Sequence, residues 1–505
     1  MKRIPFLALA AVCLLGAAPP KPKLVVAIVV DQMRYDDLTR HRSDYHAGFD
    51  RLLTRGAVFV NANYVHVPCL TAVGHSTILT GALPITSGIV GNDWFDRETN
   101  QHVTSVSDST TRLVGSTGTG SSPRRLLVST LGDELKIADG GKSRVMGVSL
   151  KDRSAILPGG RMANAAYWFD VPTGAFVSST YYLSELPSWA RDFNGGHPAD
   201  RYQGLSWLGH KLEGQGQKFY NAIETTPFGN ELVEAFAERM LAGEQLGKHD
   251  ATDVLTVSFS SNDYVGHDYG LDSNEAAQIA TRTDQLIGQL LDVVDRQVGA
   301  GQSLVVLTAD HGGAPMPEAN LARKMPGGRF VVANIKATVL TALEKKYGPG
   351  DWVAGNWDLS IFLNQKLIAE KKLDLAEVEH EAARAVGALP HVFRTYTLQD
   401  MIQGRVQPDE ITRKVANGYH TLRGPDVEFI PDPYYVVRTE DKGTSHATPF
   451  SYDTHVPVIF MGPGIRPGKY YQPVIVNDIA PTLAAILEVE TPAGSVGRIL
   501  SEIFE

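Results

Sequence analysis

The stretch LVVAIVV (24–30), followed by Asp31, sets the pattern that decides the predicted fold. The runs VLTVSF (254–259) and SLVVLTA (303–309) repeat it, because polar residues follow each of them within a few positions. Such strand-like runs alternate along the chain with helix-like segments. We therefore expect an α/β fold in which a central, mostly parallel sheet has helices on both faces.

The residues that follow these runs are of the types that bind divalent metal ions. In open α/β sheets, ligands bind just beyond the carboxyl ends of the parallel strands, so residues far apart in sequence are expected to converge there. Aspartate, histidine and a hydroxyl predict a catalytic metal site, most simply one with two ions. The candidates are Asp31, Asp263, His267, Asp310, His311 and His446, with Thr71 as the hydroxyl.

The spacing within these candidates is informative only in combination. Asp263 and His267, spaced D-x-x-x-H, are expected to grip one metal from one short loop. Asp310 and His311 leave a strand end together, so they reach two sites or straddle one. Taken alone, each histidine is better explained as a hydrogen-bonded loop residue. Their common placement after apolar runs favours metal binding.

Thr71 is the candidate nucleophile. It opens the helix-like segment TAVGHSTILTG (71–81), where free N–H groups and the helix dipole favour an anion. That environment, together with a metal ion, would make a threonine alkoxide accessible. The alternative interpretation is a helix-capping threonine, and one residue can serve both purposes.

Three further residues are candidates for binding a phosphate group. Lys151 and Arg153 follow the strand-like run SRVMGVSL (143–150), and residues two apart on an extended segment face the same way. A surface turn explains this pair equally well. Asn92 is either an amide donor to a phosphoryl oxygen or a turn residue after Gly91.

The composition and the N-terminal residues restrict the classes of protein to which the chain can belong. A net charge of −9 over 505 residues argues against a general nucleic-acid binder. Residues 1–18 have a basic start, an apolar run and small residues at the end, which predicts a cleaved signal peptide with no stable membrane anchor left behind. Cleavage would remove Cys13 and leave Cys69 without an intramolecular partner. We expect an exported bacterial protein, periplasmic or secreted.

The rest of the chain, residues 19–505, is expected to form a single catalytic domain. The alternation of strand-like and helix-like segments is interrupted over 156–225 and 320–440. We interpret both stretches as insertions that cap the sheet edge. The segment GSTGTGSS (115–122) is expected to be a mobile loop. Further helices are expected over 126–138, 274–299, 376–389 and 478–489.

Longer motifs carry a family resemblance. The segment HVPCLTAVGHSTILTGALPITSGIVGNDWFD (66–96), together with VVDQMRYDDL, DYVGH, TADHGG and GTSHATPFSYDTHVPVIF, resembles the alkaline phosphatase superfamily. Within it, the chain is similar to the type I phosphodiesterase/nucleotide pyrophosphatase-like branch, and most of all to phosphate-insensitive alkaline phosphatases that use threonine as nucleophile. Two departures are Cys69-Leu70 before the threonine and Ala447 in place of a glycine often found after the ligand histidine.

The resemblance implies two zinc ions and a zinc-dependent alkaline phosphatase that hydrolyses phosphate monoesters through a phosphothreonine intermediate. By motif position, Asp263, His267 and His446 would hold one ion. The other would be held by Asp31, Asp310, His311 and the Thr71 oxygen, and Asn92, Lys151 and Arg153 would contact phosphate. His455 competes with His446, which is preferred because its loop resembles the family's G-x-x-H segment.

Other functions remain as alternatives. A phosphodiesterase or nucleotide pyrophosphatase of the same fold is one, and Lys151 with Arg153 argues against it because a monoester carries one more negative charge. A sulfatase is disfavoured because Cys69 is not followed by C-x-P-x-R. A non-catalytic phosphate- or metal-binding protein would not need an intact nucleophile. The expected partners are small phosphate monoesters rather than nucleic acid, and a monomer is favoured.

Overall fold

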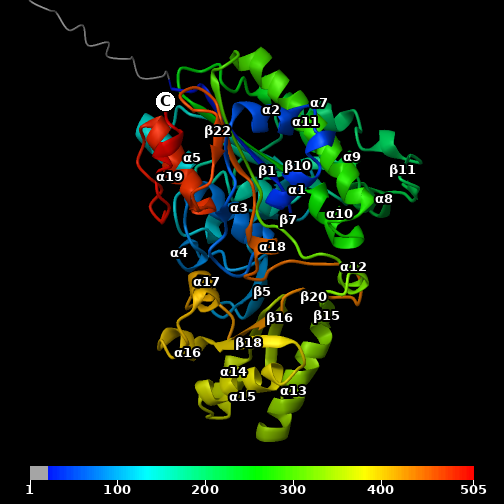
Figure 1. Ribbon diagram of the computed structural model, residues 1–505, viewed down its shortest axis with the longest axis vertical. Coiled ribbons are helices and arrows are strands. Elements are labelled where there is room, and N and C mark those ends of the chain that lie inside the picture. Colours follow the sequence, from blue (N-terminus) through cyan, green and yellow to red (C-terminus); the bar gives the residue numbers. More distant parts are fainter. Residues whose placement is uncertain (1–20) are drawn as a thin grey trace, which may run out of the picture.

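The computed structural model describes residues 21–505, and its largest element is an 11-stranded sheet (Figure 1). The signal peptide expected at 1–18 lies outside the described residues. The strands, in spatial order, are β22 (Gly468–Tyr470), β2 (Ala57–Phe59), β21 (Val458–Met461), β14 (Ser303–Thr308), β1 (Leu24–Val30), β13 (Asp253–Phe259), β8 (Val145–Ser149), β9 (Ala165–Asp170), β10 (Ala175–Ser179), β6 (Ser107–Val114) and β7 (Thr119–Ser121).

The centre of this sheet is parallel. Strands β14, β1, β13, β8 and β9 all run the same way, with Val26 aligned to Leu255 on one side and Val305 on the other. Antiparallel pairs appear only outside this group, at β21 and from β10 to β7. Every residue of β1 and β13 is buried, as expected for strands covered on both faces. The expected mostly parallel α/β sheet is confirmed.

Helices cover both faces of the sheet (Figure 1). On one side lie α2 (Gly48–Arg55), α9 (Pro227–Gly243) and α11 (Asn274–Val298). On the other lie α3 (Thr71–Thr80), α5 (Leu131–Asp139) and α19 (Ile479–Leu487). The predicted helix over 126–138 is wrong at its start. Helix α5 begins at Leu131 because the Thr130 side chain accepts from Asp133 N and caps it.

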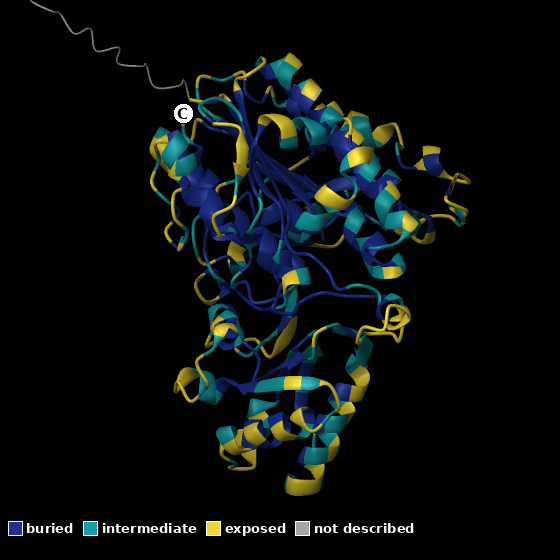
Figure 2. Cartoon of the chain, viewed as in Figure 1, coloured by how far each residue is buried: buried dark blue, intermediate teal, exposed yellow. Residues whose placement is uncertain are grey.

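Residues 328–438 form a separate lobe, which we call the cap (Figure 1). Its four-stranded sheet is antiparallel and packs against helices whose outer surfaces are exposed (Figure 2). The sheet strands are β16 (Val353–Trp357), β17 (Ser360–Leu363), β19 (Val427–Pro431) and β18 (Val392–Thr397), and the helices are α13 (Val332–Tyr347), α14 (Gln365–Glu370), α15 (Leu375–Gly387), α16 (Leu398–Ile402) and α17 (Glu410–Gly418). A parallel pair, β15 (Gly328–Val331) with β20 (Tyr435–Arg438), joins the cap to the main sheet's lobe.

The cap core is shared with the main lobe. Val67, Leu70 and Val73, on either side of Thr71, belong to the hydrophobic cluster formed by α13, α15 and the cap sheet. Val67 N also donates to Lys414 O of α17 at 3.0 Å. The loop that leads into α3 is therefore packed between the two lobes.

Two stretches differ from the sequence-based interpretation. Within 156–225, β9 and β10 are strands of the central sheet, since AAYWFD (165–170) is a fully buried run despite its Gly- and Pro-rich surroundings. Within 115–122, β7 pairs with β6, with Thr119 opposite Arg112. The segment predicted as a mobile loop is therefore in part a strand at the sheet edge.

Candidate active site

The sheet's carboxyl edge collects the candidate ligands from three neighbouring strands. Asp31 directly follows β1, and Asp310 with His311 follows β14. Strand β13 is followed by helix α10 (Ser261–Tyr269), which carries Asp263 and His267. The prediction of a short loop for this last pair is wrong. The two residues lie one helical turn apart, so their side chains share one helix face.

A first set of ligand atoms consists of Asp263, His267 and His446. The Oδ1 atom of Asp263 lies 3.1 Å from His267 Nε2 and 3.7 Å from His446 Nε2. All three ligand atoms fall within 4.8 Å of one another. This spacing allows them to bind one metal ion together.

A second set consists of Asp31, Asp263 and His311, again within 4.8 Å. His311 Nε2 is 3.5 Å from Asp31 Oδ1 and 3.4 Å from Asp310 Oδ2. Asp310 therefore lies beside this set, while Asp263 belongs to both sets. The sequence placed Asp263 in only one of them.

Backbone carbonyls orient all three histidines. The Nδ1 atoms of His267, His311 and His446 lie 2.7, 2.8 and 2.7 Å from the carbonyl oxygens of Thr444, Gly312 and Cys69. A carbonyl can only accept, so each Nδ1 carries the proton and each Nε2 lone pair points into the cluster. Burial also lowers the pKa of His311 and of His446, which keeps both rings neutral. This is the form in which histidine binds a metal.

The carboxylates carry negative charge that the chain does not fully balance. Burial, with Asp310 adding to it, raises the pKa of Asp31 well above its usual range. One oxygen of each of Asp31, Asp263 and Asp310 is buried without a hydrogen-bond partner among the described residues. Buried unpaired carboxylate oxygens next to neutral imidazoles fit divalent cations. The donor set therefore suits the implied metal ions.

Thr71 lies at the first turn of α3, against the second set. Its Oγ1 is 3.4 Å from His311 Nε2, and the residue is almost completely buried. Leu70, not Thr71, occupies the N-cap position, so the Thr71 hydroxyl is not used as a cap. Asn92 Oδ1 instead accepts from Ala72 N at 2.9 Å, which leaves the Asn92 amide nitrogen as a donor beside Thr71.

Lys151 and Arg153 lie differently from the prediction. Lys151 is the N-cap residue of α6 (Asp152–Ile156), so the pair is not on an extended segment. The Lys151 ammonium bridges Asp31 Oδ2 at 2.7 Å and Asp263 Oδ2 at 2.6 Å. Burial opposes its charge, but these two carboxylates outweigh burial and raise the pKa of Lys151. The Nε of Arg153 has no hydrogen-bond partner among the described residues.

His455, the competitor of His446, lies elsewhere. Its Nε2 is 3.0 Å from Val60 O, and its ring stacks on Tyr35 with centroids 5.0 Å apart. It belongs to neither set of ligand atoms.

The sequence interpretation missed the residues that support the ligands. His75, one turn after Thr71, places Nδ1 3.2 Å from Asp310 Oδ2 and Nε2 2.9 Å from Ser258 Oγ. Its i, i+4 spacing from Thr71 on a predicted helix was an available signal. The three carbonyls that orient the histidines could not be predicted from the sequence, because the position of a backbone group does not depend on the type of its residue.

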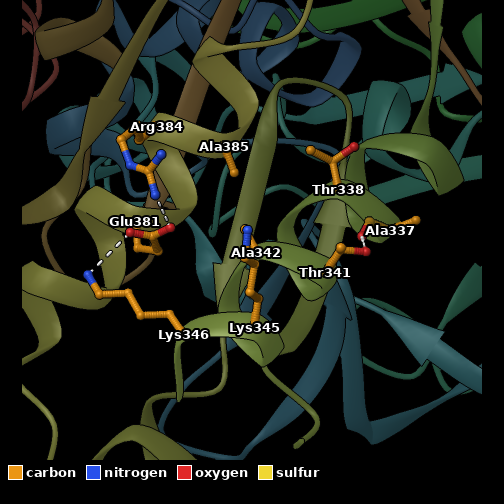
Figure 3. A pocket seen from close by; sticks show the side chains of 9 residues that line it. All are labelled: Ala337, Thr338, Thr341, Ala342, Lys345, Lys346, Glu381, Arg384 and Ala385. Atoms are coloured by element: carbon orange, nitrogen blue, oxygen red, sulfur yellow. Dashed lines mark hydrogen bonds and ion pairs between the residues drawn. The ribbon is translucent and has the colours of Figure 1, made fainter. Parts of the chain in front are cut away.

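A cavity of 270 Å³ opens beside the first set of ligands. His267, His446 and Asn92 line it from the main lobe, and cap residues line it from the other side. A larger cavity of 750 Å³ lies between α13 and α15 (Figure 3), where Glu381 pairs with Lys346 and Arg384. No aspartate, histidine or cysteine lines that cavity, whereas two of the candidate ligands, His267 and His446, line the smaller one.

A threonine at a helix start, facing aspartates and histidines at the end of a parallel sheet, defines an enzyme site of the alkaline phosphatase superfamily. Residues 25–456 match the family model of type I phosphodiesterase / nucleotide pyrophosphatase. The chain is 38% identical to alkaline phosphatase PafA of Elizabethkingia meningoseptica, covering 96% of this chain and 95% of that protein. For alkaline phosphatase PhoV of Synechococcus elongatus the identity is 36%, with 96% and 93% covered. The chain belongs to this family, as its motifs predicted.

Solved structures of related proteins have the same fold as this chain. The crystal structure of wild-type PafA matches with a TM-score of 0.90 at 36% identity, over 96% of this chain and 99% of that one. Murine ectonucleotide pyrophosphatase / phosphodiesterase 5 matches with a TM-score of 0.56 at 14% identity, over 95% of this chain and 100% of that one, which shows a shared fold.

Proposed function

We propose that this protein is a zinc-dependent alkaline phosphatase that hydrolyses phosphate monoesters with Thr71 as nucleophile. The observation that carries the proposal is the Thr71 hydroxyl at a helix start, 3.4 Å from His311 and next to two overlapping sets of metal ligands. The similar proteins PafA and PhoV are named alkaline phosphatases. A PafA crystal structure with one threonine, one asparagine, one lysine and one arginine substituted matches this chain too. These are the residue types of Thr71, Asn92, Lys151 and Arg153, in the same order.

The metal-binding residues are assigned by the two sets. Asp263, His267 and His446 would hold one zinc ion. Asp31 and His311 of the second set would hold the other, together with Asp310 and Thr71, which the family resemblance implies and which lie next to His311, and Asp263 is close to both ions. Bound zinc would supply positive charge at the phosphoryl oxygens and lower the pKa of water and of a hydroxyl. Aspartate and histidine donors also bind other divalent metals, and elemental analysis of the purified protein distinguishes them from zinc.

The residues of the site have different roles in the proposed reaction. Thr71 Oγ1 attacks phosphorus, and a phosphothreonine forms as the bond to the leaving alcohol breaks; water then releases phosphate and restores the hydroxyl. The Asn92 amide and the unpaired Arg153 guanidinium donate to phosphoryl oxygens. Lys151, between two ligand carboxylates, adds positive charge to the same space.

The competing function is phosphodiester hydrolysis by the same fold. A monoester dianion has one more charged oxygen than a diester, so Lys151 and Arg153 favour the monoester. Residues 1–18, which lie outside the described part, support a further proposal that the protein is exported with its signal peptide removed. Within residues 21–505, no helix has both the length and the apolar character required to cross a bilayer.

The test compares two substrates and three variants. Lys151→Ala and Arg153→Ala should each lower kcat/KM for nitrophenyl phosphate by roughly 30- to 1000-fold, and for bis-nitrophenyl phosphate far less. Lys248→Ala, at an exposed lysine, is the matched control and should change neither value. Elemental analysis of the same preparations should give about two zinc ions per chain. Equal losses on both substrates, or a wild-type preference for the diester, would favour the phosphodiesterase.

A further inference from the structure

The cavity beside the first set of ligands has walls from both lobes. His267 and His446 lie on the main-lobe side, and Asn356, Trp357 and Asp358 lie on the cap side. The three cap residues come from the β16–β17 hairpin, whose tip is Asp358 and Leu359. This hairpin therefore faces whatever occupies the cavity.

The proposed phosphatase function determines which part of the substrate occupies this cavity. The phosphoryl group lies at Thr71, Asn92 and Arg153, so the alcohol portion of the ester must extend away from them. The cavity starts at Asn92 and continues to the cap, so it is the space that the structure offers to the leaving alcohol. This step rests on the proposed phosphatase function.

Asp358 is a carboxylate without a partner in the cavity wall. It takes part in no hydrogen bond or ion pair of its side chain within residues 21–505, whereas Asp93, the other carboxylate of the wall, lies 2.9 Å from His102 Nε2. The backbone of Asp358 has φ +48°, a left-handed conformation that aspartate and asparagine adopt more readily than most residues. The turn thus holds a carboxylate at the cavity without a partner from the chain.

The one arginine of this wall, Arg438, is held by a backbone carbonyl and forms no ion pair with Asp358 among the described residues. Its Nε donates to Lys442 O at 3.2 Å, and its Nη1 only lies beside the protonated Nδ1 of His267. The Trp357 ring, which also lines the cavity, is held in place by stacking on His102 with centroids 4.8 Å apart. An aromatic face next to a free carboxylate favours a cationic group.

We propose that Asn356, Trp357 and Asp358 form the leaving-group subsite, and that Asp358 makes the enzyme prefer monoesters of amino alcohols over monoesters of hydroxy acids. The preference arises because the carboxylate attracts an ammonium group on the leaving alcohol and repels a carboxylate there. Asp358 acts on specificity, and the transfer of phosphate to Thr71 proceeds as described above.

Three phosphate esters of similar size test this subsite. O-phosphoethanolamine has a cationic leaving alcohol, 2-phosphoglycolate an anionic one and propyl phosphate a neutral one. With kcat/KM measured near neutral pH, where the amine is protonated, the wild type should favour the phosphoethanolamine over the phosphoglycolate. Asp358→Asn should reduce this ratio roughly tenfold, an amount typical of a partly exposed charge interaction counted once for each sign. Propyl phosphate serves to normalise both values.

Further variants separate charge from shape. Asp358→Glu keeps the charge and should retain most of the preference, and Asp358→Ser should lose it as Asp358→Asn does. Glu344→Gln removes an exposed carboxylate from α13 of the same cap and should leave the ratio unchanged. An unchanged ratio in both Asp358→Asn and Asp358→Ser overturns the subsite while the phosphatase stands. If the wild type hydrolyses none of the three esters nor nitrophenyl phosphate, the proposed function fails and the subsite fails with it.

Discussion

The two halves of the metal-binding cluster are built in different ways. Asp31, Asp310 and His311 leave the ends of β1 and β14 and are wholly inaccessible to solvent. His267 and His446 come from helix α10 and a loop, and the His267 side chain is 19% exposed. The half next to the nucleophile thus lies at the ends of fully buried strands. The half next to the cavity is partly open to solvent, and under the proposed function it faces the entering substrate and the leaving alcohol.

From this difference we expect that removal of a reactive side chain in the half next to the nucleophile, the inner half, abolishes most of the activity. Thr71→Ala should lower kcat for nitrophenyl phosphate by at least about 10³-fold, because no neighbouring group can replace the hydroxyl. Zinc content should stay close to that of the wild type, since the carboxylates and imidazoles remain. Kinetics with metal analysis on one preparation checks both values. Thr71→Ser keeps the hydroxyl and should retain measurable activity, and phosphate found on another residue after acid quenching would contradict the assignment.

A matched pair of histidine variants compares the halves directly. We expect His267→Ala to lose on the order of 100-fold in activity at trace zinc and to recover much of it in excess zinc, because water can reach the vacated position. His311→Ala should not recover, since its position is completely buried. Metal titration followed by activity measures this. His380→Ala, at an exposed histidine paired with Asp400, is the control. Equal recovery of both variants would remove the distinction.

Lys151 connects the halves, since it bridges Asp31 and Asp263. In zinc-free protein, Lys151→Met should lower the free energy of unfolding by about 3 kcal/mol, because two buried carboxylates lose their shared cation. With zinc bound the loss should be smaller, since the metal supplies the missing charge. Urea unfolding with and without chelator checks the difference. The same loss in both states would show that the ammonium and the metals do not compensate for each other.

The smallest expected effect is a change in stability at the half of the cluster next to the cavity. Ala447 follows His446 and has φ +100°, a conformation that is strained for alanine and free for glycine. Ala447→Gly should raise the free energy of unfolding by less than about 1 kcal/mol, because relief of strain is partly offset by the greater freedom of the unfolded chain. Thermal unfolding is the measurement, and a lower Tm would show that the backbone here is not strained.

The sequence predicted this site as far as side chains and strand ends carry information. Asp31, Asp310 and His311 could be placed because each follows a buried apolar strand, and His446 could be preferred to His455 by its loop. The helix under Asp263 and His267 could not be foreseen, because D-x-x-x-H fits a loop equally well. The link from Lys151 to two carboxylates depends on the order of strands in space. The cap hairpin at Asp358 depends on how two lobes dock, which no local pattern encodes.

The hydrophobic cluster around Val67, Leu70 and Val73 makes the nucleophile loop and the cap inseparable for protein engineering. A Cβ at Gly418 of α17 would overlap Val67 O, so the cap fits this loop by close backbone contact as well as by apolar packing. Exchanging caps between family members to change substrate preference would therefore also disturb the segment that positions Thr71. A graft that carries residues 66–73 together with the cap, as one cassette, should preserve turnover where a graft of the cap alone would not.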